Sequence, residues 1–320
     1  MQVGYISALR DTIKDIMLKD RASILMGMNI SSGGLWGESR GLDEYVSQRR
    51  IIDTPYSIPS IIGSALGLSM SGARPIVTIK GEYLLKAADV IANKVAISDY
   101  ITNNQFSSDV LIISEIDIDA QKGAQGVSIY ESVFSQIHGL KVIAVSSAAD
   151  VRRMVTAAYD CEGPVLVLLC TQSMDDVCEE NTLPYEMGSS QILREGEDVT
   201  VITYGPAVKK VLMAADEAAE MGVSCEVIDV VCLSDIDIDL IEKSVIKTAK
   251  AVVVHDSRKN LGIASEVVSK IVESEAFFYL EDKILRVCAK DAVVPYSKDE
   301  FKLFVPSKEE ILDAIVNMGK

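Results

Sequence analysis

One of the only two histidines in the chain, His255, lies where proton chemistry is expected. It follows the apolar run 251–254 (AVVV) and directly precedes Asp256. Open α/β sheets place functional groups at the carboxyl ends of their strands, and histidine is the side chain that most readily changes charge near neutral pH. His255 is therefore our candidate catalytic acid or base, with a hydrogen-bonded loop histidine as the alternative. The other histidine, His138, is interpreted as structural.

Three aspartates alternate with isoleucine over residues 235–239 (DIDID), a pattern that could indicate a metal site. Alternate residues of a helix do not converge on one point, and a helical stretch, LIEKSV, follows at once. Carboxylates before a helix usually cap its free N–H groups and offset its dipole. We therefore predict capping and no metal site. The run 116–119 (IDID) is interpreted in the same way, with a role in a cleft as the alternative.

The six cysteines form no C-x-x-C pair, and several lie inside apolar runs such as 165–170 (VLVLLC). Disulfides are rare in reducing compartments, so we expect free, buried thiols. The first ten residues show no basic leader followed by an apolar segment. No uncharged stretch reaches the ~18 residues that indicate a membrane span. These features predict a cytoplasmic protein.

The charge balance argues against two classes of partner. The 320 residues include 31 basic and 47 acidic side chains, which gives a formal charge of -16. Such a field repels nucleic-acid phosphates and anionic membrane surfaces. A basic protein partner remains compatible with this charge, although a solvated acidic surface is the commoner reason for it.

The elements that must position these residues are predicted from seven short apolar runs bounded by turn residues. These predicted strands are residues 75–79, 110–114, 141–145, 164–169, 199–204, 225–230 and 251–255. Runs that are apolar at every position suit strands covered on both faces, as in parallel sheets.

Amphipathic helices are predicted between these runs, at 148–159 and at 207–221, where Gly222 ends the pattern. Alternating strands and helices predict an α/β fold with two open, mainly parallel-sheet domains. The stretch 172–197 is polar, acidic and rich in turn residues, so we place the domains at 1–185 and 186–320.

Nine stretches carry a family resemblance through their order and spacing. They are WGESRGL (36–42), RRIIDTPYS (49–57), GSALGLSMSGARP (63–75), KAADVIAN (86–93), GLKV (139–142), REGEDVTVITYG (194–205), SVIKT (244–248), VVVHD (252–256) and GIASE (262–266). Taken together they resemble the beta subunits of pyruvate, branched-chain 2-oxoacid and acetoin dehydrogenase complexes. These subunits are related to the pyrimidine-binding and C-terminal domains of transketolase.

The resemblance implies thiamine diphosphate as cofactor, held at the contact between an alpha and a beta chain of an alpha2beta2 heterotetramer with a beta–beta contact. In that family an alpha subunit holds the diphosphate and its magnesium through a G-D-G motif, which this sequence lacks. An alpha-type partner is therefore expected. A lipoyl acyltransferase is a further partner that the resemblance allows.

Three departures from the family pattern affect the expected site. Ile58 stands where the family has the glutamate that bonds to the aminopyrimidine and activates the cofactor. Gly126 stands where it has a histidine that faces the substrate, and 100–105 (YITNNQ) replaces a Y-M-S-G-G-Q segment. A charged hydrogen bond of the missing kind contributes roughly 1.5–3 kcal/mol, and general acid–base catalysis is worth about 10²–10⁴ in rate.

The resemblance places Ser57, Ile58 and Tyr83 at the cofactor. The Tyr83 ring would pack on the aminopyrimidine, since stacking needs only a flat aromatic face; an ordinary core tyrosine is the alternative. Two hypotheses for function stay open. In the first, the chain completes a thiamine-diphosphate enzyme that acts on a 2-oxoacid or ketose-like donor. In the second, it is a non-catalytic paralogue that stabilises or regulates a partner subunit.

Overall fold

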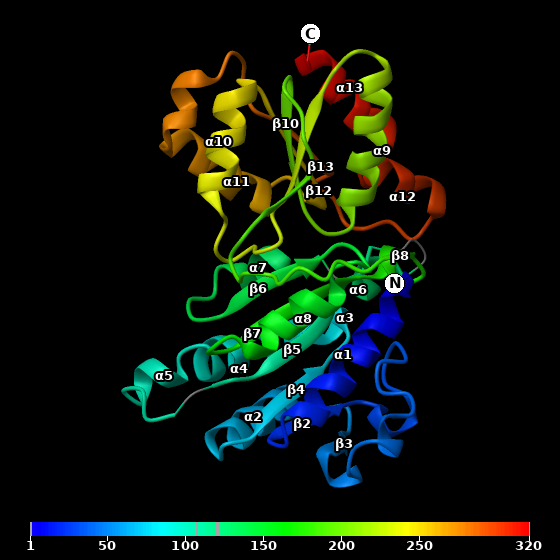
Figure 1. Ribbon diagram of the computed structural model, residues 1–320, viewed down its shortest axis with the longest axis vertical. Helices are drawn as coiled ribbons and strands as arrows, with labels where there is room; N and C mark the ends of the chain where they lie inside the picture. Colours follow the sequence, from blue (N-terminus) through cyan, green and yellow to red (C-terminus); the bar gives the residue numbers. More distant parts are fainter. Residues whose placement is uncertain (1, 107, 119–121, 128, 320) are drawn as a thin grey trace. The chain divides into compact units, whose positions relative to one another are not determined.

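The computed structural model describes residues 2–106, 108–118, 122–127 and 129–319. Asp119, the last residue of the second acidic run, and Ser128, beside Gly126, lie outside the described residues. The chain forms two compact units, each built on its own sheet (Figure 1). The first unit comprises Met1–Asp117 and Val133–Met187, and the second comprises Ile118–Ser132 and Gly188–Lys320. The main break therefore lies at 187/188, and the segment 118–132 groups with the second unit.

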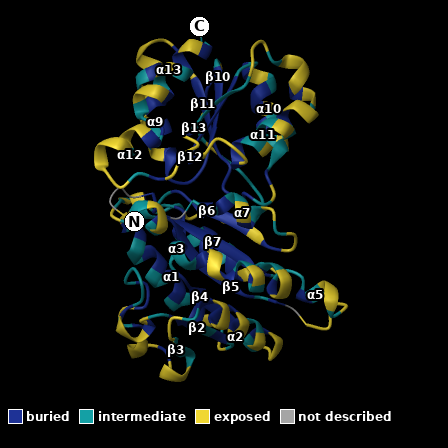
Figure 2. Ribbon diagram, turned by 180° about the vertical axis from the view of Figure 1, so that it is seen from behind, coloured by how far each residue is buried: buried dark blue, intermediate teal, exposed yellow. Residues whose placement is uncertain are grey.

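The first unit contains a six-stranded parallel sheet in the order β3-β2-β4-β5-β7-β6. Its strands are β2 (Ser23–Gly27), β3 (Ile51–Asp53), β4 (Arg74–Thr78), β5 (Leu111–Ile116), β6 (Lys141–Val145) and β7 (Val165–Cys170). Strands β5 and β7 are buried at every position, as their uninterrupted apolar runs predict (Figure 2). A separate two-stranded ribbon pairs β1 (Gln2–Gly4) with β8 (Val177–Glu179) in the antiparallel sense.

Helices cover this sheet, and shorter turns connect its strands. The longer helices are α1 (Tyr5–Lys19), α2 (Ile58–Met70) and α8 (Val151–Asp160). The shorter ones are α3 (Gly81–Leu84), α4 (Ala88–Val90), a π-helix (Ile91–Val95), α5 (Ser98–Ile101) and α7 (Glu131–Ser135), of which the first two residues group with the second unit. The 3-10 turns are at Ile30–Ser32, Leu42–Glu44, Gln48–Arg50, Leu85–Ala87 and Thr171–Ser173. α1 packs against α8, and α2 packs against β4.

The second unit has a five-stranded sheet in the order β13-β12-β10-β11-β9, in which only the edge strand β9 is antiparallel. Its strands are β9 (Gln191–Arg194), β10 (Val199–Thr203), β11 (Cys225–Asp229), β12 (Ala251–Arg258) and β13 (Leu285–Ala289). Its helices are α6 (Gly123–Gly126), α9 (Ala207–Glu220), α10 (Ile238–Thr248), α11 (Ile263–Glu273), α12 (Lys298–Phe304) and α13 (Lys308–Gly319), with a 3-10 turn at Glu275–Tyr279. α9 and α13 cover one face of the sheet, and α10 and α11 cover the other (Figure 1).

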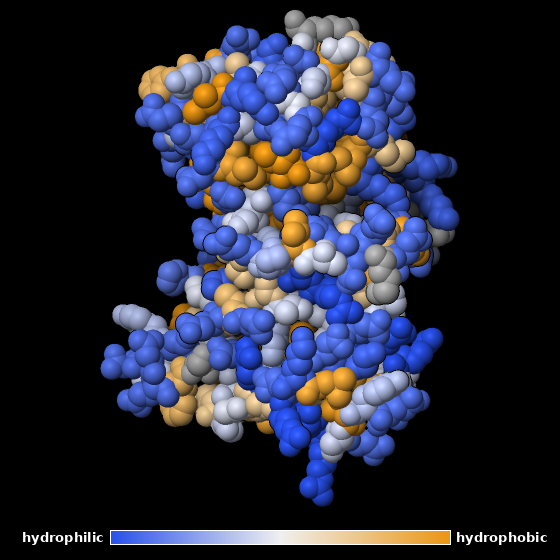
Figure 3. Space-filling view, in the orientation of Figure 1, coloured by the Kyte–Doolittle hydropathy of each residue, from blue (hydrophilic) through white to orange (hydrophobic). Residues whose placement is uncertain are grey.

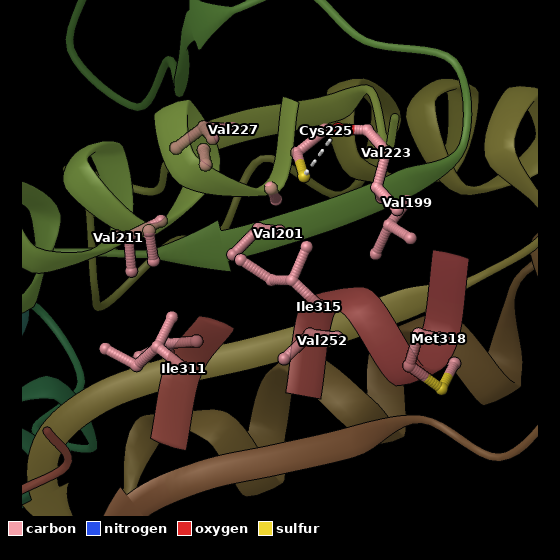
Figure 4. Close-up of a cluster of buried hydrophobic side chains, with 14 of the residues drawn as sticks. Val199, Val201, Val211, Val223, Cys225, Val227, Val252, Ile311, Ile315 and Met318 are labelled. Carbon is pink, nitrogen blue, oxygen red and sulfur yellow. Dashed lines mark hydrogen bonds between the residues drawn. The ribbon is translucent and has the colours of Figure 1, made fainter. Parts of the chain in front are cut away.

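The core of the second unit explains this layering. Val199 and Val201 of β10 point into an apolar cluster shared with Val211 of α9 and with Ile311 and Ile315 of α13 (Figure 4). Full burial of each such side chain contributes about 1.5–3 kcal/mol. Elsewhere, hydrophilic side chains cover most of the face in Figure 3, in keeping with the excess of charge in the sequence.

All seven predicted strands and both predicted helices are present, so the two-domain, mainly parallel α/β prediction is confirmed. The helix predicted at 148–159 begins three residues later, at Val151, where Asp150 is its N-cap residue. The capping interpretation of the first acidic run is also confirmed at Asp237. Its Oδ1 accepts a hydrogen bond of 3.2 Å from the backbone N–H of Leu240, in the first turn of α10.

Candidate functional site

The predicted cofactor residues lie at one edge of the six-stranded sheet. β2 lies between β3 and β4, so the chain order of the strands reverses there, and ligands of open α/β sheets bind at the carboxyl ends beside such a reversal. Ser57 and Ile58 follow the carboxyl end of β3, and Tyr83 follows that of β4. The fold thus brings two segments that are 25 residues apart in sequence to the same edge of the first unit.

Tyr83 is one member of an aromatic and cationic cluster at this edge. Its ring lies 4.9 Å from that of Tyr56, centroid to centroid, at an angle of 81°. The Lys86 ammonium lies 4.7 Å from the Tyr56 ring and 5.2 Å from the Tyr83 ring, and it donates to the Tyr56 hydroxyl. A hydrogen bond with Glu82, with partial burial, raises the pKa of Tyr83, which keeps the phenol neutral. With Tyr56 52 % exposed, the cluster offers aromatic surface to a flat ring.

Ile58 begins α2, and its side chain is only 1 % exposed in this chain. Ser57 is the N-cap residue of α2, but its hydroxyl lies 2.9 Å from that of Ser60 rather than on a free N–H of the helix. Pro59 follows, where the missing N–H has no cost. Contact of Ser57 and Ile58 with a cofactor stays a prediction. What the structure adds is that an aliphatic, buried side chain begins this helix.

Two further features shape the edge. Asp53, at the end of β3, accepts a hydrogen bond of 2.9 Å from the backbone N–H of Ser31, and hydrogen bonds from the Ser31 hydroxyl and N–H lower the pKa of that carboxyl. At the ends of β2 and β4, the fully buried Thr78 hydroxyl has no hydrogen-bond partner among the described residues. A Cβ at Gly27 would lie 2.6 Å from that hydroxyl, so only glycine fits there.

The segment 100–105 does not share this edge. It borders a hollow of about 690 Å³ that is also lined by residues leading into β6 and β7, such as Lys141 and Pro164, at the amino ends of those strands. Asn103 and Asn104, where the resembled segment has two glycines, adopt φ values of 52° and 58°. Asparagine is among the few residues that tolerate this left-handed conformation, so the replacement preserves the backbone turn.

His255 is fully buried and surrounded by backbone groups. The N–H of Ser257 points to its Nδ1 at 3.1 Å, and the N–H of Ala264, in the first turn of α11, points to its Nε2 at 3.2 Å. Neutral imidazole has a single accepting nitrogen, so only one of these amides meets a lone pair at a time. Burial lowers the pKa of His255 to about 4, and the Arg286 charge adds to this, so the ring is neutral at pH 7. A catalytic role for His255 stays a prediction; its contacts are those of a residue that caps a helix.

The second unit also holds a buried polar cluster that the sequence did not reveal. The Tyr204 hydroxyl donates to Glu131 Oε1 at 2.8 Å, and the Lys210 ammonium lies 2.5 Å from Asp256 Oδ1. The Tyr204 ring also lies 5.5 Å from the His255 ring. The only signal in the sequence was the His255-Asp256 pair, because Glu131 is 73 residues distant from Tyr204 along the chain. Tyr56 could have been noticed, since it occupies the variable position of the D-T-P-x-S motif.

Two negative findings apply to the described parts of the chain. No group of three or more histidine, cysteine or acidic side chains there could hold a metal ion. No helix there is both long enough and apolar enough to cross a membrane. The six cysteines are free thiols, and Cys170, Cys225 and Cys232 are buried.

Comparison with known proteins covers both units. Residues 1–175 match the family model of the transketolase pyrimidine-binding domain, and residues 188–311 match that of the transketolase C-terminal domain. The chain is 32 % identical to the pyruvate dehydrogenase E1 component subunit beta of Rickettsia bellii over 98 % of each chain. It is 31 % identical to the same subunit of Bacillus subtilis, over 98 % of this chain and 97 % of the relative. A solved split-gene transketolase, described as an inactive beta4 tetramer, has the same fold, with a TM-score of 0.80 and 17 % identity over 99 % of each chain.

Proposed function

Because the chain belongs to the transketolase-like family that includes the beta subunits of the pyruvate dehydrogenase E1 component, we propose that it completes a heteromeric thiamine-diphosphate enzyme acting on a 2-oxoacid or ketose-like donor. The observation that carries the proposal is the ring pair of exposed Tyr56 and half-buried Tyr83 at the carboxyl edge of the first sheet. There the fold offers a flat aromatic surface beside a reversal of strand order.

The residues at this edge fit the pyrimidine half of thiamine diphosphate. Tyr83 supplies a ring to stack on, and the unpaired Thr78 hydroxyl beside Gly27 marks a polar position left open in this chain. When bound, the cofactor supplies a nucleophilic carbon for attack on a 2-oxo group. The chain has no G-D-G motif for diphosphate and magnesium, so both are proposed to be held by an alpha-type partner.

The proposed assembly is an alpha2beta2 heterotetramer with a beta–beta contact, in the cytoplasm, and a lipoyl acyltransferase is a further candidate partner. Within it, this chain orients the cofactor and excludes water but moves no proton at position 58. Isoleucine neither donates nor accepts, and Gly126 has no side chain to protonate a substrate. We therefore expect a specialised reaction, carboligating or non-decarboxylating, in which the partner or the cofactor itself provides the proton transfers.

One observation favours the alternative, a non-catalytic paralogue that stabilises or regulates a partner subunit. Ile58 is buried in its own unit, and the single chain presents no acid–base group in its place. A scaffold subunit would keep the fold and tolerate exactly this kind of loss. Cofactor binding and turnover, measured separately, distinguish the two functions.

The first test is to co-purify the chain with an alpha-type partner and titrate thiamine diphosphate and magnesium by calorimetry, then measure 2-oxoacid turnover with an artificial electron acceptor. We expect binding that weakens about tenfold in Tyr83→Leu but little in Tyr83→Phe, because the phenyl ring keeps the stacking surface. Equal loss in both variants, or no binding by the wild-type pair, would contradict the proposed site. Tight binding without any turnover would support the paralogue.

A second test concerns position 58. In the reconstituted pair, Ile58→Glu is expected to raise the rate of proton exchange at the thiazolium carbon by about 10²-fold, the lower limit for a general acid–base group. Ile58→Gln, of similar size, is the matched control and should leave the rate unchanged. If the two variants exchange at the same rate, position 58 does not face the cofactor.

A further inference from the structure

The segment between β5 and β6 joins the two units in an unusual way. The chain leaves the first unit after Asp117, and residues Ile118–Ser132 group with the second unit before the chain returns at Val133. This segment contains α6 and Gly126, the position at which the resembled family has its substrate-facing histidine. Both of its ends are thus covalently attached to the first unit, while Val127 and Glu131 make contacts within the second.

Apolar contacts provide one attachment of the segment. Val127 is buried in a small cluster with Ala289, Val294 and Phe304 of the second unit, and Ile129 packs against this cluster. Burying one valine contributes about 1.5–3 kcal/mol. This small cluster can hold the segment near the unit, but apolar contacts are not directional, so it does not by itself fix the orientation of the neighbouring residues.

A directional attachment comes from Glu131, which is 3 % exposed. Its Oε1 accepts the 2.8 Å hydrogen bond from Tyr204, which immediately follows β10, and its carboxyl also bonds with the Ser257 side chain of β12. Asp256 lies in the same cluster and pairs with Lys210 of α9, whose ammonium also donates to the Pro306 carbonyl at 3.0 Å. Glu131 is therefore bonded to the carboxyl ends of two neighbouring central strands.

The charged and titratable groups around Glu131 come from four strands and helices: β10, β12, β13 and α9. Burial raises the pKa of Asp256 on β12, and its pairing with Lys210 on α9 opposes that shift, while His255 on β12 is neutral. Burial raises the pKa of the Tyr204 phenol, after β10, and of the Cys288 thiol, on β13, and keeps both groups neutral. Arg286 on β13 donates to Lys259 O and Ser265 Oγ. Burial raises the pKa of Glu131, and the Asp256 charge raises it further, so proton uptake there relieves an unfavourable charge.

We propose that Glu131 is a positioning residue, which through its hydrogen bond with Tyr204 fixes residues 122–127 and 129–132 within the second unit and thereby sets the place of Gly126. That the loop serves the reaction rests on the proposed function; that it is held in this way does not. The hydrogen bond to Tyr204 can have this effect because the described residues of the segment, 118, 122–127 and 129–132, belong to no strand. Loss of the bond would loosen the segment without disrupting either sheet.

The direct test is amide hydrogen exchange of the full chain. Tyr204→Phe removes only the hydroxyl, and loss of one hydrogen bond to a carboxyl should speed exchange of residues 122–132 about tenfold. Residues 238–248 of α10, in the same unit, should be unaffected. Tyr159→Phe is the matched control, since the Tyr159 hydroxyl bonds to Asp20 Oδ2 at 2.6 Å in the first unit. Unchanged exchange in Tyr204→Phe, or equal acceleration in both variants, would overturn the proposal.

A second arm separates positioning from simple stability. Glu131→Gln keeps an oxygen that can accept from Tyr204 and should preserve slow exchange, whereas Glu131→Ala should not. In the reconstituted pair, Glu131→Ala is expected to lower kcat about tenfold with little change in KM, and Glu131→Gln to restore it. An absence of turnover in the wild-type pair would count against the proposed function and leave the exchange result standing. Faster exchange with an unchanged kcat would reject the role in the reaction.

Discussion

Both sheets have a reversal of strand order, at β2 in the first and at β10 in the second, but the side chains at their carboxyl edges differ in chemistry. In the first unit, the edge beside β2 and β4 carries the exposed Tyr56, the half-buried Tyr83 and the exposed Lys86. In the second, the edge beside β10 and β12 carries Glu131, Tyr204, His255 and Asp256, all of them buried. The buried titratable side chains therefore lie at the edge of the second sheet.

This contrast teaches that residue type is a weaker guide to a binding site than accessibility. His255 was the most conspicuous acid–base candidate in the sequence, but backbone N–H groups contact both of its ring nitrogens. Tyr56 attracted no attention in the sequence, and it offers the most accessible aromatic surface at the first edge. At the second edge, the buried polar groups make the fold specific through their hydrogen bonds to one another. At the first edge, aromatic surface remains accessible to a ligand.

The largest expected effect tests whether the second edge is as closely packed as its contacts indicate. A Cβ in Gly262→Ala would overlap the Arg258 carbonyl oxygen and lie 2.9 Å from His255 Cε1. We expect the free energy of unfolding to fall by about 4 kcal/mol, measured by urea denaturation, because the β12–α11 connection must move. Gly63→Ala in α2, where a Cβ meets nothing within 4 Å, is the control and should stabilise by about 0.5–1 kcal/mol. If Gly262→Ala lowers the free energy of unfolding by less than about 1 kcal/mol, the second edge is not closely packed.

The next largest effect is the pH dependence of stability that the buried groups of the second edge should cause. The folded pKa of His255, about 4, lies below its ordinary value of 6.5, so its contribution to stability is complete above pH 6.5 and is lost as the pH falls through 4. The loss amounts to about 3 kcal/mol at most. Glu131, whose pKa is raised, has the opposite dependence and destabilises the fold as the pH rises through its folded pKa. Denaturation at pH 7, 5.5 and 4.5 should therefore show a steeper acid loss for wild type than for His255→Gln; equal slopes would place the ring in contact with water.

The smallest expected effect is at the first edge. Lys86→Met removes a cation that lies over the Tyr56 and Tyr83 rings, and exposed cation–π contacts contribute about 0.5–1 kcal/mol. Stability should fall by no more than that, and the loss should shrink in high salt because exposed charges are screened. A loss of several kcal/mol would mean that the cluster is part of the core and no accessible surface.

Much of the fold could be predicted because buried parallel strands have a simple signature. The run that became β7 is apolar throughout, and those that became β5 and β12 begin with several apolar residues, so their boundaries were predicted to within a few residues. Most of the missed strands are short or partly exposed, such as β3 with three residues and β9 with Arg194 at its end. β13 was missed because Arg286 interrupts its apolar pattern. β2 was missed as well, although it is buried at all but one of its positions.

The site was less predictable, for a physical reason. Motif spacing brought Ser57, Ile58 and Tyr83 to attention, but it carried no information about burial, which decides what each side chain can do. Long-range pairs such as Glu131 with Tyr204 depend on the tertiary path of the chain. The contiguous division at 185/186 likewise missed that residues 118–132 group with the later part of the sequence.

Because residues 118–132 group with the second unit, neither unit corresponds to one continuous stretch of the chain. A cut at 187/188 would leave residues 118–132 on the first fragment. That fragment lacks the partners of Val127 and Glu131. The complementary fragment would expose Phe304 and Val294 to water and leave the Tyr204 hydroxyl without its acceptor. When expressed separately, the two fragments should therefore tend to aggregate. When mixed, they should regain solubility by forming a non-covalent complex through residues 118–132.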